Sequence, residues 1–346
     1  MQSMARNGSV DGLRLIAAFG VVALHCGYFP EFPGLVTDML KAGLRWAVPF
    51  FFMVTGVFLA DAQGRFVKVS MARLVRLCLI FVTGFLIYLP LLLWQKGIAG
   101  LVPAILVEGS NMHLWFLAAM VIGLLGHALM AEIGSYPLAV GLAVAIVLGA
   151  IVSSYLVQFG IGEALGARLL FRELSGFSCL LAGAALHRLS HWSARPFALC
   201  LALGLGLLCV EISWLWWTGA RALYLDWAFF VPFLSFGLIG LALRGRIAWS
   251  PRMAGWGRQD ALTIYILHPW AIVAILSLWS GRMTYRLSDG PASSTMLWAL
   301  ASVLSLILAL ALRRFSPRFY ALLNGQWQRS GGGRSSSAAA AVSPGP

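Results

Sequence analysis

The chain has 346 residues, of which 60% are hydrophobic and only 11% are charged, and its mean hydropathy is +0.85. This composition excludes an ordinary soluble domain, in which about 25% of the residues are charged. The formal net charge of +13 would suit a nucleic-acid-binding protein, but its distribution follows the pattern of a membrane protein. We therefore expect an all-α, polytopic membrane helix bundle with no nucleic-acid partner.

Apolar stretches suited to crossing about 30 Å of hydrocarbon recur ten times. We place them at 10–28, 43–61, 74–94, 114–131, 137–157, 174–189, 196–217, 227–243, 261–279 and 295–312. With ten spans, both termini lie on one side of the membrane. Of the 25 Lys and Arg residues, sixteen flank that side and eight flank the other, which predicts cytoplasmic termini and contacts with anionic lipids.

The domain organisation follows from the short loops between these spans. We expect one integral-membrane domain over 1–330, and a low-complexity cytoplasmic tail over 331–346 that need not fold. Five cysteines lie in apolar segments at irregular spacing, so neither a disulfide framework nor a metal site is expected.

The first span is unusual because it carries Asp11, Arg14 and His25. A charged side chain near the bilayer centre costs at least a few kcal/mol, so this span is expected to hold a site. Eleven helical steps place Arg14 and His25 on nearly the same face, about 16 Å apart in depth. The alternative is an Asp11–Arg14 ion pair and a buried structural histidine.

Polar residues mark three later spans. Arg73 and Arg76 project from one face where the third span begins, and their guanidinium groups suit phosphates, of a ligand or of lipid headgroups. Glu211 lies fifteen residues into the seventh span, at the expected depth of His25, which makes a His–carboxylate pair geometrically feasible. His268 lies at mid-depth in the ninth span.

Five segments together resemble the acyltransferase-3 family of bacterial integral-membrane O-acyltransferases, especially the branch that acetylates surface polysaccharides. The resemblance covers roughly 7–320. The segments are Val-Asp-Gly-Leu-Arg at 10–14 with an Arg-x10-His spacing to His25, Pro-Phe-Phe-Phe-Met-Val-Thr-Gly at 49–56, Arg-Leu-Val-Arg at 73–76, His-Leu-Trp-Phe-Leu at 113–117 and Ile-Tyr-Ile-Leu-His-Pro at 264–269.

The resemblance implies a function. Such proteins, in the bacterial inner membrane, move an acetyl or similar acyl group from cytoplasmic acyl-CoA to a hydroxyl outside that membrane. The expected acceptor is a surface polysaccharide or its lipid-linked, polyprenyl precursor. The family's Arg-x10-His maps onto Arg14 and His25, and its Arg-x-x-Arg maps onto Arg73 and Arg76.

The chemistry of the residues agrees with this implication. Acyl transfer to a hydroxyl needs a base, and the His25 imidazole titrates near neutrality. Arg73 and Arg76 are expected to clamp the phosphates of acetyl-CoA or another acyl-CoA, with Arg14 lining the path. His268 is a candidate contact for the pantetheine arm of CoA.

The start of the fourth span is the expected place where the acceptor binds. His113 opens the fourth span from the external side and Trp115 follows, so both are candidate acceptor contacts, although interfacial Trp is ordinary.

The alternative function is a transporter or flippase for a glycan or an acylated small molecule, which would also keep charges near the midplane.

Overall fold

The computed structural model describes residues 7–61, 65–102, 105–161, 164–189, 192–220, 225–284, 286–291 and 293–326. Within these ranges the regular structure is helical, and the β-structure is one isolated bridge between Ala60 and Phe66. The tail expected at 331–346 lies outside the described residues.

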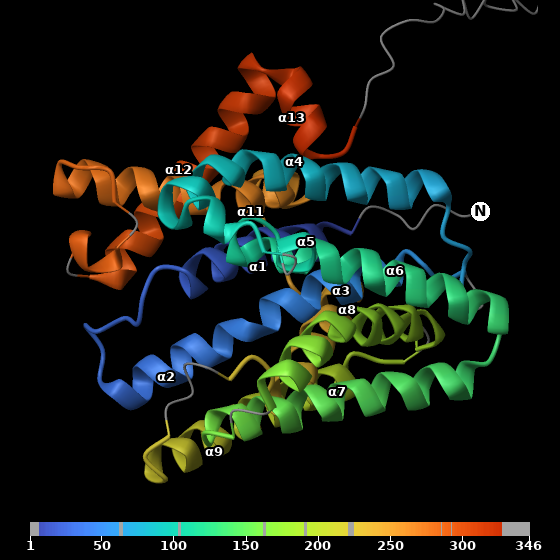
Figure 1. The fold of residues 1–346 in the computed structure, drawn as a ribbon. Helices are drawn as coiled ribbons and strands as arrows, with labels where there is room; N and C mark the ends of the chain where they lie inside the picture. Colours follow the sequence, from blue (N-terminus) through green and yellow to red (C-terminus); the bar gives the residue numbers. More distant parts are fainter. Residues whose placement is uncertain are drawn as a thin grey trace, which may run out of the picture.

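The α-helices are bundled as Figure 1 shows. Their bounds are α1 Gly8–Leu24, α2 Gly34–Gly43, α3 Ala47–Val57, α4 Met71–Lys96, α5 Ile105–Glu108, α6 Trp115–Ile133, α7 Tyr136–Gln158, α8 Ala164–Arg188, α9 Arg195–Trp217, α10 Phe230–Leu243, α11 Pro251–Ser280, α12 Ser294–Phe315 and α13 Pro317–Leu323. Short 3-10 turns lie between some of them: η1 Leu44–Trp46, η2 Ile98–Gly100, η3 Met112–Leu114 and η5 Leu287–Asp289.

The expected all-α polytopic bundle is confirmed. Among the described residues, eight helical segments are long and apolar enough to cross a membrane, and one of them joins α2, η1 and α3 into Gly34–Val57. The first and eighth of the ten expected spans are the shorter helices α1 (17 residues) and α10 (14 residues).

Three helices begin about ten residues before the expected spans: Gly34–Val57, α8 and α11. Hydropathy finds the part of a helix that suits hydrocarbon, and it misses polar turns that extend the same helix. The first turns of α11 illustrate this, because they carry Arg252, Arg258 and Asp260.

Polar residues cap several helix starts. The Asn7 side chain accepts hydrogen bonds from the backbone N–H groups of Ser9 and Val10, which begins α1. Ser70, Ser250 and Ser293 do the same for α4, α11 and α12. These caps satisfy N–H groups that have no partner inside the helix.

The helices divide into a buried centre and a lipid-facing periphery. The most apolar window of α11 is 67% buried inside the protein, whereas the corresponding window of α9 is 17% buried. α1 packs along α11, and α8 packs against α3, α6 and α7. In Figure 1, α4 and α13 lie at the top of the bundle, and α7 and α9 lie at the bottom.

Glycines allow the central helices to approach closely. A Cβ atom on Gly183 of α8 would lie 2.0 Å from the Met53 carbonyl oxygen of α3, and one on Gly56 would lie 2.0 Å from the Leu180 carbonyl oxygen. A Cβ atom on Gly257 of α11 would lie 1.8 Å from the Asp11 carbonyl oxygen of α1. Small residues of this kind drive helix association where lipid removes the hydrophobic driving force.

The expected pairing of Glu211 with His25 is wrong, because the Glu211 carboxylate in α9 binds the start of α10 instead. Its carboxylate accepts hydrogen bonds from the Tyr155 hydroxyl and from the backbone N–H groups of Phe229 (3.0 Å) and Phe230 (3.3 Å). Among the described residues no hydrogen bond joins Glu211 to His25. Equal depth was the basis of the prediction, but the carboxylate turns toward the N-terminus of α10, where N–H groups favour an anion.

We expect Gly183→Ala to lower the thermal unfolding temperature of the detergent-solubilised protein, because the new methyl group forces α8 away from α3. Gly141 of α7 is the matched control, since a Cβ atom there meets nothing within 4 Å. Gly141→Ala should hold or raise the unfolding temperature, because alanine favours a helix by about 1 kcal/mol over glycine. Equal behaviour of the two variants would show that the α3–α8 crossing is not tight.

Glu211→Ala should destabilise the fold by about 1–3 kcal/mol, because it leaves buried N–H groups of α10 without an acceptor. The measurement is thermal unfolding followed by tryptophan fluorescence. Glu211→Gln, which keeps one carbonyl acceptor, should lose less. A Glu211→Ala protein that unfolds at the wild-type temperature would contradict this structural role.

Candidate active site

Three histidines from separate segments meet in the bundle, and we call them the histidine cluster: His25, His113 and His268. The His268 ring lies 5.1 Å from the His25 ring and 5.2 Å from the His113 ring, between centroids. His25 is the C-cap of α1, which ends at Leu24, four residues before the expected end of the span. His113 lies in η3 and His268 in the middle of α11.

A proline fixes the orientation of His268. Pro269 has no N–H group, so it cannot donate to the Tyr265 carbonyl one turn earlier in α11. The His268 Nδ1 lies 2.7 Å from that carbonyl oxygen and donates to it, because a carbonyl only accepts. This leaves the Nε2 of His268 as a bare acceptor.

His113 is held in the same way. Its Nδ1 lies 3.1 Å from the Asn111 Oδ1, and its backbone carbonyl accepts a hydrogen bond from the Tyr265 hydroxyl. The Tyr88 ring lies 4.8 Å from the His113 ring. The Nε2 atoms of His113 and His268 are both buried, and neither has a hydrogen-bond partner among the described residues.

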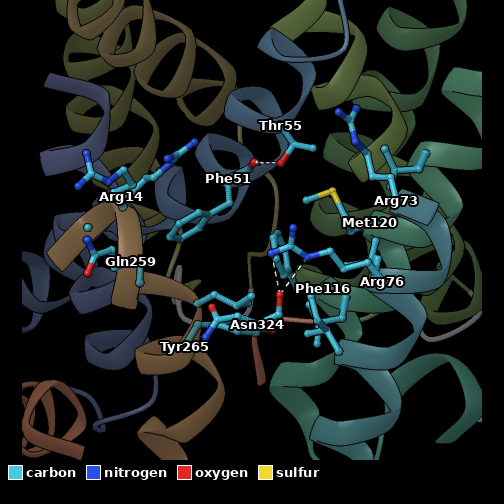
Figure 2. A pocket seen from close by; sticks show the side chains of 18 residues that line it. Arg14, Phe51, Thr55, Arg73, Arg76, Phe116, Met120, Gln259, Tyr265 and Asn324 are labelled. Carbon is cyan, nitrogen blue, oxygen red and sulfur yellow. Dashed lines mark hydrogen bonds between the residues drawn. The ribbon is translucent and has the colours of Figure 1, made fainter. Parts of the chain in front are cut away.

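A cavity of about 460 Å³ opens beside the cluster, and we call it the arginine cavity. Figure 2 shows Arg14 and Gln259 on one wall and Arg73 and Arg76 on the facing wall. Arg258 also lines it. The remaining lining residues are Phe51, Thr55, Leu77, Ile80, Phe116, Leu117, Met120, Leu124, Gly257, Ala261, Leu262, Tyr265 and Asn324.

The cationic side chains of this cavity differ in how they are held. Arg14 pairs with Asp11 at 2.8 Å. Arg76 donates from Nε (3.0 Å) and Nη2 (2.8 Å) to the Asn324 backbone carbonyl. Arg73 and Arg258 are exposed, and their side chains have no hydrogen-bond partner in the described part of the chain. The cavity therefore carries more positive than negative charge and suits a polyanionic ligand.

Asn324, which follows α13, lines the arginine cavity, and no pattern in the sequence pointed to it. Its side-chain amide donates to the Thr263 Oγ1 of α11 at 3.0 Å and to the Tyr320 carbonyl at 2.9 Å. The Tyr320 hydroxyl in turn donates to the Asp260 carboxylate at 3.0 Å. Burial, followed by the charge of Asp260, raises the pKa of Tyr320 to about 12 and keeps this hydroxyl protonated.

A second cavity of about 270 Å³, the lysine cavity, is lined by His25 of the histidine cluster and shares no lining residue with the arginine cavity. Its lining residues are Leu24, His25, Gly27, Tyr28, Lys41, Asn111, Met112, Pro269, Ile272 and Leu287. The Lys41 ammonium donates to the carbonyl oxygens of Ala23 (3.3 Å) and Leu24 (2.7 Å) at the end of α1. Lys41 thereby fixes the backbone that carries His25.

Each of three chain segments has residues of the arginine cavity at one end and residues of the lysine cavity at the other. Along α1, Arg14 lines the arginine cavity and His25 lines the lysine cavity. Along α11, Tyr265 lines the first and Pro269 the second, with His268 between them. His113 likewise lies between Met112 of the lysine cavity and Phe116 of the arginine cavity.

The expected site residues are thus partly brought together. Arg14, Arg73 and Arg76 share one cavity, and His25 lines the other. His113 and His268 pack with His25 and line neither cavity. Trp115 lies outside both linings, and the Arg172 guanidinium sits 4.9 Å above its ring.

The arrangement combines parts needed for group transfer between two substrates. The arginine cavity supplies cations for phosphates, and the lysine cavity presents an imidazole that can act as a base. The histidine cluster separates them. Among the described residues, no group of three or more His, Cys, Asp or Glu side chains has the arrangement of a metal site.

Comparison with known proteins gives partial matches to two racemases. The chain is 33% identical over 133 residues to the serine/alanine racemase of Enterococcus gallinarum, covering 34% of this chain and 19% of that protein. It is 30% identical over 139 residues to an amino-acid racemase of Enterococcus faecalis, covering 35% of this chain and 18% of that protein. The chain thus spans about a fifth of the length of these curated relatives. No solved structure matches it.

A family comparison covers far more of the chain. The model of the acyltransferase-3 family, described as an acyltransferase domain, matches residues 7–314. This match includes α1 through nearly all of α12, and therefore the histidine cluster and both arginine-bearing walls. The chain is a multi-pass membrane protein that belongs to the acyltransferase-3 family.

Proposed function

We propose that the protein is an acyl-CoA-dependent O-acyltransferase of the bacterial inner membrane. It takes an acetyl group from cytoplasmic acetyl-CoA and delivers it to a hydroxyl of a surface polysaccharide, or of its polyprenyl-linked precursor, on the external side. Family membership supports acyl transfer. The observation that carries the rest is the order of the two cavities along α1, with Arg14 in one and His25 in the other.

The arginine cavity is the proposed donor site. CoA carries three phosphate groups and cannot enter hydrocarbon, so its nucleotide end needs a basic site at a membrane surface. Arg73 lies at the start of α4 and Arg258 near the start of α11, and both side chains are exposed. Their ends of the helices lie on the side that the distribution of basic residues assigns to the cytoplasm.

His25 is the proposed catalytic base. Its imidazole takes the proton of the acceptor hydroxyl while the hydroxyl oxygen attacks the thioester carbonyl carbon. The carbon–sulfur bond then breaks, the ester forms, and the CoA thiolate takes the proton back from the imidazolium. The acceptor enters from the lysine cavity, where His25 is partly exposed. Glu211 has no part in this scheme, because its carboxylate holds α10.

A transporter remains the competing function, since cavities on either side of a buried polar cluster also suit alternating access. A transporter of glycans has no need to recognise the nucleotide end of CoA. The racemase relatives do not favour racemisation here, because the shared segment is about a fifth of their length.

We expect His25→Ala to abolish acetylation of surface glycans while the protein still inserts into the membrane. The imidazole is the proposed base, and general-base catalysis contributes about 100- to 10,000-fold. Mass spectrometry of surface glycans from a deletion strain carrying the variant gives the readout. His127→Ala, at a buried histidine outside both cavity linings, is the control for expression and folding. Wild-type acetylation by His25→Ala would remove His25 from the mechanism.

Replacing Arg73 and Arg76 together by alanine should weaken acetyl-CoA binding by at least tenfold in isothermal titration with the detergent-solubilised protein. Wild-type affinity should also fall as salt rises, because exposed phosphate contacts are screened. Arg313→Ala is a control arginine that pairs with Asp260 and lies outside the cavity lining. Unchanged binding by the double variant would place the nucleotide elsewhere.

A further inference from the structure

The histidine cluster contains two acceptors without a partner in the part of the chain that the structure describes. The Nε2 atoms of His113 and His268 are buried and have no hydrogen-bond partner among the described residues. The exposed fraction of His113 is 2% and that of His268 is 0%. Buried polar groups are normally paired, so two unpaired acceptors on neighbouring rings need an explanation. Their place beside His25 and Tyr265 makes a ligand that supplies the donors the explanation to test.

Both acceptors are fixed in place rather than free to turn away. Pro269 frees the Tyr265 carbonyl, and that carbonyl holds the Nδ1–H of His268. Asn111 holds the Nδ1–H of His113, and the Tyr265 hydroxyl bonds the His113 backbone carbonyl. Tyr88 packs against the His113 ring and donates to the Ile266 carbonyl at 2.6 Å. Pre-arranged acceptors of this kind are typical of a binding site.

The position of the two acceptors limits what the ligand can be. Both rings pack against Tyr265, which lines the arginine cavity, and the His268 ring also packs against His25. A ligand that reaches from the arginine cavity to His25 therefore passes the two histidines. A charged segment would be costly at this depth. The segment must therefore be slender, uncharged and equipped with hydrogen-bond donors.

We propose that His113 and His268 form a binding site for the amide groups of an acyl-pantetheine arm, with each Nε2 accepting one N–H. This arm is the uncharged part of acyl-CoA, and it carries two amide N–H groups between the pyrophosphate and the thioester. The proposal rests on the proposed function, because it assigns the donor to the arginine cavity. It moves His113 from the acceptor side, where the sequence suggested it, to the donor side.

The distances along the helices suit this assignment. From Arg14 to His25, α1 rises by about 16 Å over eleven residues. The extended arm of CoA has a comparable length. The Tyr265 and Phe116 rings lie 5.3 Å apart at the boundary of the arginine cavity, so the arm passes beside an aromatic wall before it reaches the two histidines.

The test separates the arm of the donor from its nucleotide end. Isothermal titration of the full-length protein in detergent compares acetyl-CoA with 3′-phosphoadenosine 5′-diphosphate, which lacks the arm. His113→Asn and His268→Asn keep a donor at the Nδ1 position and remove the Nε2 acceptor. Each variant should bind acetyl-CoA about three- to tenfold more weakly, the usual effect of one hydrogen bond, and bind the nucleotide as wild type does.

Two further variants keep the result interpretable. His268→Gln places an acceptor near the Nε2 position and should recover part of the lost affinity for acetyl-CoA. His127→Asn, at a buried histidine whose ring packs against Phe66, should change neither affinity.

The possible failures are distinct. Wild-type affinity for acetyl-CoA in both Asn variants overturns the inference and leaves the proposed function standing. An equal loss of acetyl-CoA and nucleotide binding also overturns it, because the effect would not be specific to the arm. If the wild-type protein binds neither compound, the proposed function itself fails.

Discussion

The packing of α1 along α11 is the contact on which the rest of the site depends. Gly257 of α11 lies so close to the Asp11 carbonyl of α1 that any side chain would force the helices apart. This contact sets both helices in register. It places Arg14 beside Arg258 at one end and His25 beside His268 at the other. Polar groups inside a membrane protein need such a rigid frame, because a misplaced group has no water to supply its hydrogen bonds.

Pro269 of α11 also helps to position the site, because it determines how the His268 ring is oriented. A proline within a helix leaves one backbone carbonyl without its N–H partner, which is costly in hydrocarbon unless another donor replaces it. In α11 the residue before Pro269 supplies that donor, because the His268 ring bonds the Tyr265 carbonyl. The cost of the proline is offset locally, and the imidazole acquires a fixed orientation in the same step.

Much of the fold was predictable because the bilayer imposes it. Apolar length predicted the helices. The arginines at 14, 73 and 76 were expected to serve one ligand, and in the structure they line one cavity. The Asp11–Arg14 ion pair, which belonged to the alternative interpretation of the first span, is also present, so that part of the alternative is correct. These features depend on residues near one another in sequence, or on a motif that the family shares.

The remaining features depend on how helices rotate and pack, which a single sequence does not encode locally. Equal depth suggested that Glu211 meets His25, but depth says nothing about the direction of a side chain, and Glu211 faces α10. Asn324 and Lys41 are ordinary residues by sequence. They matter because tertiary packing sets the Asn324 carbonyl against Arg76 and the Lys41 ammonium against the end of α1. Packing also places Arg14 and His25, which lie on nearly one face of the first span, in two separate cavities.

The central claim is that one donor molecule reaches from the arginine cavity to His25. A cryo-electron microscopy structure of the protein in lipid nanodiscs with bound acetyl-CoA tests it most directly. The account predicts density for the phosphates beside Arg73 and Arg76, and the thioester within hydrogen-bonding reach of the His25 ring. Density that places the whole donor on one side of the histidine cluster, with its thioester remote from His25, would contradict the account.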